Sequence, residues 1–125
     1  MTPFGHFIES RRRSRRLRQS DLAEMIGVNP SYISSIESGR KGPPSKALLL
    51  KIIEALSLSS EEVTNLYLSV EQSQRVIRLP ENTSAEECRV LSSFVNRLGS
   101  LSREELTIIG NLLVLGEKTA KEVTL

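Results

Sequence analysis

The sequence predicts an all-α protein made of short amphipathic helices. Between Phe4 and Leu115, apolar residues recur at spacings of three and four, the pattern of one helix face. Most of these segments begin after Ser or Asn, which cap helix N-termini, and several end at Gly. Aromatic residues make up 4% of the chain and Trp is absent, so Leu, Ile and Val must form the core.

The first three helices are expected at about residues 4–15, 19–26 and 30–37. Phe4 begins an i, i+3, i+4 apolar pattern in the first helix, and Leu22 begins an inward-facing set in the second. Asn29 is a typical N-cap, and Pro30 is a typical first residue of a helix. Gly39 is expected to end the third helix because glycine adopts a positive φ without strain.

Two further helices are expected before a linker. Ser45 caps the fourth, which reaches about residue 56, and Ser59 with Glu62 forms a capping box for the fifth, which reaches residue 70 or beyond. Residues 74–83 are predicted to be a linker, and Pro80 within it stops any helix that arrives from upstream. The predicted domains are therefore residues 1–73, and a separate helical segment at residues 84–125.

The C-terminal segment is expected to contain two helices, at residues 85–98 and 103–115. Each begins with Ser followed three residues later by Glu, the pattern of a capping box. Gly99 is expected to end the first of them and Gly116 the second, with residues 117–125 frayed.

Charge is distributed unevenly along the chain. Residues 1–51 carry ten Lys and Arg and four Asp and Glu, a net charge of +6. Residues 80–125 carry five basic and seven acidic residues, a net charge of −2. This asymmetry favours a first part that binds a polyanion and a second part with another role.

Residues 17–40, LRQSDLAEMIGVNPSYISSIESGR, carry a pattern of Gln, Leu-Ala, Gly-Val, Ile, Ile-Glu and Gly-Arg. In this pattern the chain resembles the lambda-repressor-like (Cro-type, xenobiotic-response-element) helix-turn-helix family over roughly residues 4–70. The resemblance implies a five-helix DNA-binding domain, and it does not extend to the two helices expected after residue 84. It also implies a bacterial or phage transcriptional regulator, in particular a repressor, whose third helix enters the major groove.

The resemblance assigns roles to residues around the turn. Those expected at base edges are Pro30, Ser31, Tyr32 and Ser35. Those expected at phosphates are Arg18, Gln19, Asn29, Ser38, Arg40 and Lys41. Two alternatives stay open at this point: the serines are ordinary solvated surface, or Tyr32 stacks on a neighbouring side chain.

The arginine run at residues 11–18 cannot face one partner, because six arginines in eight residues surround a helix. By resemblance, Arg12 is expected to form a structural ion pair with Glu37. Arg16 stands where the family frequently has Gly, and Arg18 where it usually has a Ser or Thr cap. The rest of the run either attracts phosphates or forms a solvated charged face.

Other chemistry is not indicated by this sequence. His6 has no Cys or His partner for a metal. Cys88, the only cysteine, lies on the apolar face of its predicted helix and is expected in the core. We expect no catalytic residue, no metal and no cofactor, hence no enzyme. The N-terminus has no apolar segment of a secretion signal, which favours a cytoplasmic, nucleoid-associated protein.

The two C-terminal helices cannot bury both of their apolar faces against each other, which favours a homodimer. The residues expected at the dimer contact are Leu91, Phe94, Val95, Leu98, Ile109, Leu112 and Leu113. In one alternative, these helices pack on their own DNA-binding domain. In another, the chain is an antitoxin or phage-type regulator whose C-terminal half binds, or is cleaved by, a partner protein.

Overall fold

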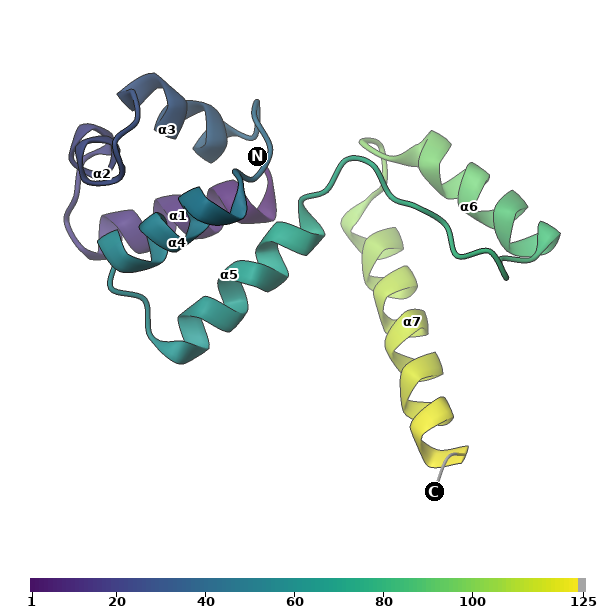
Figure 1. Cartoon of the computed structure of the whole chain (residues 1–125). Coiled ribbons are helices and arrows are strands. Elements are labelled where there is room, and N and C mark those ends of the chain that lie inside the picture. The colour runs from purple at the N-terminus through teal and green to yellow at the C-terminus, as the bar shows by residue number, and fades with distance from the viewer. Residues whose placement is uncertain (124–125) are drawn as a thin grey trace. The chain divides into compact units, whose positions relative to one another are not determined.

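The computed structural model describes the backbone of residues 1–123 and the side chains of residues 1–117 (Figure 1). Within these residues the chain forms seven helices and no strand, which confirms the all-α prediction. They are α1 (Pro3–Ser14), α2 (Gln19–Ile26), α3 (Pro30–Ser38), α4 (Lys46–Ala55), α5 (Ser60–Gln72), α6 (Ala85–Arg97) and α7 (Arg103–Val123). The chain divides into two compact units, Met1–Arg78 and Leu79–Leu125.

The first unit encloses one hydrophobic core. In it α1 packs against α3 and α5, while α2 packs against α3 and α4. The buried apolar residues come from all five helices and the turn after α4: Phe4, Ile8, Leu22, Ala23, Ile26, Ile33, Ile36, Leu49, Ile52, Leu56 and Leu66. A core of this kind lets five short helices hold one another in place although none would be stable alone.

Helix ends in the first unit follow the predicted signals. The Oδ1 of Asn29 accepts a hydrogen bond from the backbone N–H of Ser31 at 3.0 Å, and Ser59 and Glu62 form the predicted capping box. Gly27 and Gly39 end α2 and α3 in left-handed conformations, with φ of 75° and 84°. These caps fix where α3 begins and ends.

Gly5 allows the closest helix approach in the first unit. A Cβ at Gly5 would lie 2.5 Å from the carbonyl oxygen of Ile36 and 2.6 Å from that of Glu37. Both oxygens belong to the backbone, which cannot move aside without displacing α3. Gly5 sits inside a helix, where no cap or turn signal in the sequence points to a close approach.

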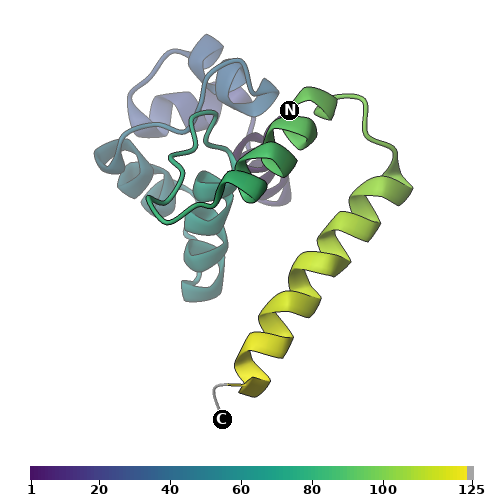
Figure 2. The ribbon, with the colours of Figure 1, turned by 90° about the vertical axis from the view of Figure 1, so that its right-hand side faces the viewer.

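The second unit consists of α6, a short turn through Gly99 and α7, and the chain reverses direction between the two helices (Figure 2). The predicted end of the last helix at Gly116 was wrong, because α7 continues to Val123. Glycine inside a helix costs only about 1 kcal/mol relative to alanine, and no proline follows to stop the helix. Residues 124–125, also predicted to be frayed, lie outside the described part of the chain.

Apolar side chains of the second unit are largely uncovered. No residue of α6 is buried, and Cys88, expected in a core, is exposed. None of the helices in the described residues is apolar over a length that would cross a membrane.

Candidate nucleic-acid interface

The turn between α2 and α3 presents one side of α3 to solvent. Ile33 and Ile36 anchor the opposite side in the core, where they are fully buried. Pro30 and Ser31 at the start of the helix are exposed, whereas Tyr32 and Ser35 are half-buried. The four residues predicted to read bases therefore lie on the first two turns of a helix whose position the core fixes.

Three of the four serine hydroxyls of α3 donate to their own helix or its cap. Ser31 Oγ donates to Oδ1 of Asn29 at 3.0 Å, and Ser35 Oγ donates to the carbonyl of Ser31 at 2.9 Å. Ser38 Oγ likewise donates to the carbonyl of Ser35 at 3.2 Å. A hydroxyl has one hydrogen and two lone pairs, so these oxygens keep acceptor capacity for a ligand.

Tyr32 is held by contacts within the domain. Its ring packs against the core, and Nζ of Lys41 lies 5.4 Å from the ring centroid, within cation–π range. Burial also raises the pKa of the Tyr32 hydroxyl above its usual range. The ring thus contacts a neighbouring side chain within the first unit, and the contact of Tyr32 with a base edge stays a prediction.

A buried network joins the three helices at the interface. Arg12 donates from Nε to Oε2 of Glu37 at 2.7 Å and from Nη2 to Oε1 at 3.0 Å. The side-chain hydrogen bond to Glu37 raises the pKa of Arg12 despite the opposing effect of burial. Gln19 Nε2 also donates to Glu37 Oε1, at 3.0 Å, and keeps a second hydrogen for another acceptor.

The loop after α3 places two cations at the end of that helix. Arg40 and Lys41 are both exposed, and the backbone N–H of Lys41 donates to the carbonyl of Ser35 at 3.1 Å. This bond folds the loop back along α3. All four predicted base-reading residues therefore lie along α3, and the predicted phosphate-contacting residues lie at its two ends, except Arg18 and Gln19 at the start of α2.

A helix-turn-helix family model matches residues 8–63. A 10 kDa protein of the ImmF control region of Bacillus phage phi105 is 32% identical over 63 residues, which are 50% of this chain and 70% of that protein. The chain belongs to the helix-turn-helix family.

Two Bacillus subtilis (strain 168) proteins match the same half of the chain. The HTH-type transcriptional repressor RghR is 38% identical over 61 residues, 49% of this chain and 45% of RghR. The uncharacterized HTH-type transcriptional regulator RghRB is 35% identical over 63 residues, 50% of this chain and 45% of RghRB. The matched segment thus spans just under half the length of these two relatives. No solved structure is significantly similar to the chain.

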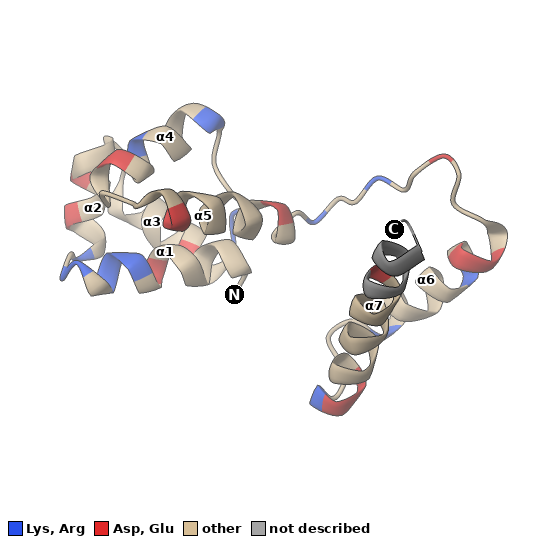
Figure 3. Ribbon diagram, turned by 90° about the horizontal axis from the view of Figure 1, so that it is seen from below, with Lys and Arg blue, Asp and Glu red and all other residues tan. Residues whose placement is uncertain are grey.

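Most arginines of the run at residues 11–18 pair with acidic residues of the first unit. Arg11 and Arg15 both bind Glu62 on α5, at 3.0 and 2.9 Å, and Arg13 pairs with Glu9 at 3.2 Å. Figure 3 shows the run as a blue stretch along α1. Only the Arg12–Glu37 pair was predicted among these ion pairs, and the pairs of Arg11 and Arg15 had no sequence signal because Glu62 lies about fifty residues away.

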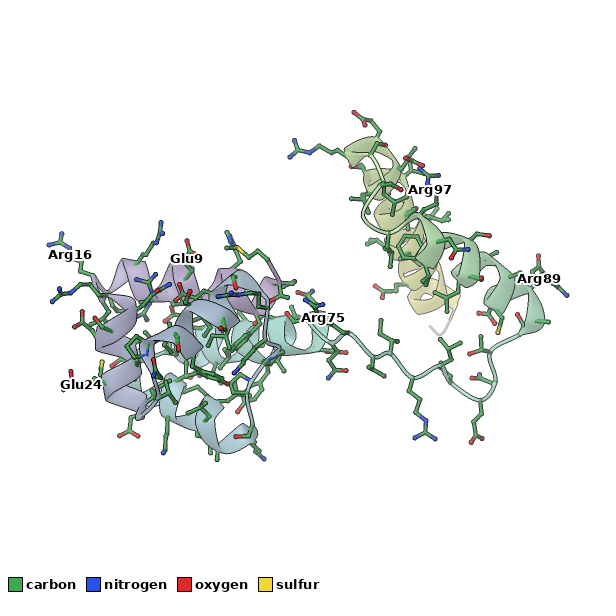
Figure 4. The ribbon with its side chains drawn as sticks, turned by 90° about the horizontal axis from the view of Figure 1, so that it is seen from above. Glu9, Arg16, Glu24, Arg75, Arg89 and Arg97 are labelled. Carbon is green, nitrogen blue, oxygen red and sulfur yellow. The ribbon has the colours of Figure 1, made fainter. Side chains whose placement is uncertain are left out.

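Arg16 and Arg18 are the exposed members next to α2. Arg16 has a φ of 57°, a left-handed conformation that explains why glycine is frequent at this place in the family (Figure 4). The Arg18 side chain cannot accept a capping hydrogen bond. Its backbone N–H donates to Asp21 Oδ2 at 2.8 Å, and its carbonyl accepts from the N–H of Leu22 at 3.2 Å. Its side chain is 85% exposed and contacts the same carboxylate at 3.5 Å.

In the second unit five of the seven predicted contact residues line an apolar groove of about 780 Å³ between α6 and α7, whereas Val95 and Leu98 lie outside its lining. Leu91, Phe94 and Ile109 are half-buried in it. The others are exposed: Val95, Leu98, Leu112 and Leu113. No cluster of three or more potential metal ligands occurs in the described residues of the chain.

Proposed function

We propose that the chain is a sequence-specific DNA-binding transcriptional repressor, encoded by a bacterium or a phage, that acts at the nucleoid in the bacterial cytoplasm. It inserts α3 into the major groove and reads a palindromic operator as a homodimer. The observation that carries the proposal is the polar outer side of α3, whose last turn binds Gln19 from the start of α2 and whose C-terminal end continues into the exposed Arg40 and Lys41. The printed descriptions of RghR and RghRB, a repressor and a regulator, support the same function.

The proposed contacts divide into two groups. Base edges meet the start of α3, where Ser31 and Ser35 offer acceptors and Pro30 offers an apolar contact to a thymine methyl. Phosphates meet the ends of the helices: the free N–H groups and Gln19 at the start of α2, the N-cap Asn29, and Ser38, Arg40 and Lys41 after α3.

Salt dependence tests the proposal in its simplest form. A fluorescence-polarisation titration of labelled duplex should lose about 10³ in affinity between 50 and 200 mM salt if about six phosphates are engaged. Because Arg11, Arg12 and Arg15 have acidic partners, the contacts must come from the residues just named and from Arg16 and Arg18. An affinity that does not change with salt would exclude DNA as the partner.

Paired substitutions separate reading from positioning. Ser31→Ala with Ser35→Ala should reduce the preference for a selected site and leave binding to random duplex nearly unchanged. Arg40→Gln with Lys41→Gln should weaken binding to every duplex by a similar factor. Selection of bound sites from random DNA supplies the specific duplex. If both double variants changed binding to the selected site and to random duplex in the same way, the division into base-reading and phosphate-contacting residues would be wrong.

The homodimer is proposed to form through the α6–α7 groove and the exposed apolar residues beside it. A helix-turn-helix dimer reads half-sites about 34 Å apart, so a self-associating segment serves this reader. The groove exists on every copy, which satisfies the requirement of a two-fold interface for one self-complementary surface.

The same apolar surface also favours the second candidate, a regulator or antitoxin whose C-terminal half binds another protein. The oligomeric state of the purified chain separates the two candidates. If the chain is a homodimeric repressor, a second copy covers the groove and the purified chain is a dimer. If the chain is a regulator or antitoxin that binds another protein, the purified chain is a monomer until that protein is added.

A further inference from the structure

Arg75 connects the end of the first unit to the end of α3. It follows α5, within the segment predicted as linker, and Figure 4 shows it where the chain leaves the first unit. Its Nη2 donates a hydrogen bond of 2.8 Å to the carbonyl oxygen of Gly39, the C-cap of α3. A residue 36 positions away in sequence is thereby placed at the end of the proposed recognition helix.

The carbonyl of Gly39, to which Arg75 donates, lies in a closely packed part of the first unit. A Cβ on Gly39 would lie 3.1 Å from the backbone N and from Cγ2 of Thr2, so the N-terminal residues pack closely on one side. Arg40 and Lys41 continue the chain directly from the carbonyl that Arg75 binds. Three cationic side chains from two distant segments therefore gather at one end of α3.

The bond to Gly39 leaves most of the Arg75 guanidinium free. A guanidinium carries five N–H donors in a planar fork, and the structure assigns one of them to Gly39. Guanidinium groups bind phosphate with paired hydrogen bonds, and phosphates flank the groove that a recognition helix enters.

We propose that Arg75 binds a backbone phosphate of DNA together with Arg40 and Lys41, and that its bond to Gly39 positions it for this. The proposal rests on the proposed function. It extends the DNA contact beyond residues 16–41 to a residue of the predicted linker, residues 74–83.

A purely structural role for Arg75 predicts a different result. A cation near a helix C-terminus stabilises the helix through its dipole, and this effect requires no DNA. The two roles are separated by measuring, on the same variants of the full chain, both unfolding by denaturant and the slope of log affinity against log salt on a random duplex.

Arg75→Gln should reduce the magnitude of the salt slope by about 0.9 for each bound chain, so that raising salt fourfold costs about threefold less affinity than in wild type. Arg75→Lys should keep the wild-type slope because it keeps the charge. Arg89→Gln, which removes an exposed arginine from α6 in the second unit, is the matched control and should leave the slope unchanged.

Each contrary outcome overturns a defined statement. A wild-type slope in Arg75→Gln, with or without lower stability, would make Arg75 a helix cap only and leave the proposed function standing. An equal loss of slope in Arg89→Gln would show a general effect of net charge and reject the specific contact. A wild-type chain that binds no duplex would overturn the proposed function and this inference together.

Discussion

The two units of the chain begin their helices with the same local signals but differ in how much of their apolar helix surface is buried. Capping boxes begin α5 in the first unit and α6 in the second, with the same Ser and Glu spacing and the same pair of hydrogen bonds. Yet α5 buries Leu66 completely, whereas α6 buries no residue. Local sequence therefore determines where a helix begins, and the availability of other helices determines whether its apolar face is covered.

Size explains the difference. The first unit has five helices, enough to surround one core, but two helices cannot surround each other, and domains of about 40 residues are rarely stable alone. The exposed apolar residues of α7, such as Ile108 and Leu112, are each about two-thirds exposed. The second unit thus exposes apolar helix faces that another chain could bury, and this exposure is the basis for proposing self-association.

The largest expected effect of a substitution is at the buried ion pair of the first unit. Glu37→Ala leaves Arg12 and Gln19 without their shared acceptor and should lower the free energy of unfolding by about 3–5 kcal/mol. Chemical denaturation measures it. Glu105→Ala, which breaks the exposed pair with Arg97 in the second unit, should have a much smaller effect. Similar losses for the two variants would contradict the contrast between the units.

The close approach of α1 to α3 should give the next largest effect. Gly5→Ala forces a Cβ against two backbone oxygens of α3 and should cost about 3 kcal/mol, again by chemical denaturation. Gly116→Ala in α7 meets nothing within 4 Å and should make the second unit more helical by circular dichroism. A neutral Gly5→Ala would show that α1 and α3 can separate freely.

Acid should act on the first unit through Glu62. Hydrogen bonds from Arg15, from the backbone of Ser59 and from Arg11 lower the pKa of this carboxyl from 4.5 to about 2. A depressed pKa in the folded state contributes stability above pH 4.5, and this contribution is lost as the pH falls toward 2. In denaturation at a series of pH values, wild type should therefore lose more stability over this range than Glu62→Gln. Parallel curves would remove Glu62 from this role.

The smallest expected effect is at a strained residue. Arg16→Gly replaces a left-handed arginine and should raise the free energy of unfolding by about 0.5–1 kcal/mol, after the greater chain entropy of glycine is subtracted. Gly27→Ala tests the opposite change, because it places a side chain at a φ of 75° where nothing else lies within 4 Å. It should lower the free energy of unfolding by a similar amount. A loss of stability in Arg16→Gly would mean that the arginine side chain has a stabilising contact that outweighs the strain.

Element positions were predictable because their signals are local. Asn29, Ser45 and Ser59 act on backbone groups within three residues, and each begins a helix where the sequence predicted one. The predicted end of α7 was wrong because the sequence does not distinguish a glycine inside a helix from a glycine that ends one.

Contacts between distant residues could not be predicted in the same way. The pairing of Arg12 with Glu37 came only from a family resemblance. The pairs of Arg11 and Arg15 with Glu62, and the bond from Arg75 to Gly39, join residues 36 or more positions apart. No helical spacing or cap signal reports such contacts, because they depend on how the helices are packed.

Sedimentation velocity of the full chain beside the fragment 1–78 tests the contrast between the units most directly. The fragment keeps the whole buried core and should be a folded monomer. The full chain should be a dimer at tens of micromolar, and the Phe94→Glu, Ile109→Glu double variant should return it to a monomer while its first unit stays folded. A monomeric full chain, or a fragment that remains a tight dimer, would contradict the account.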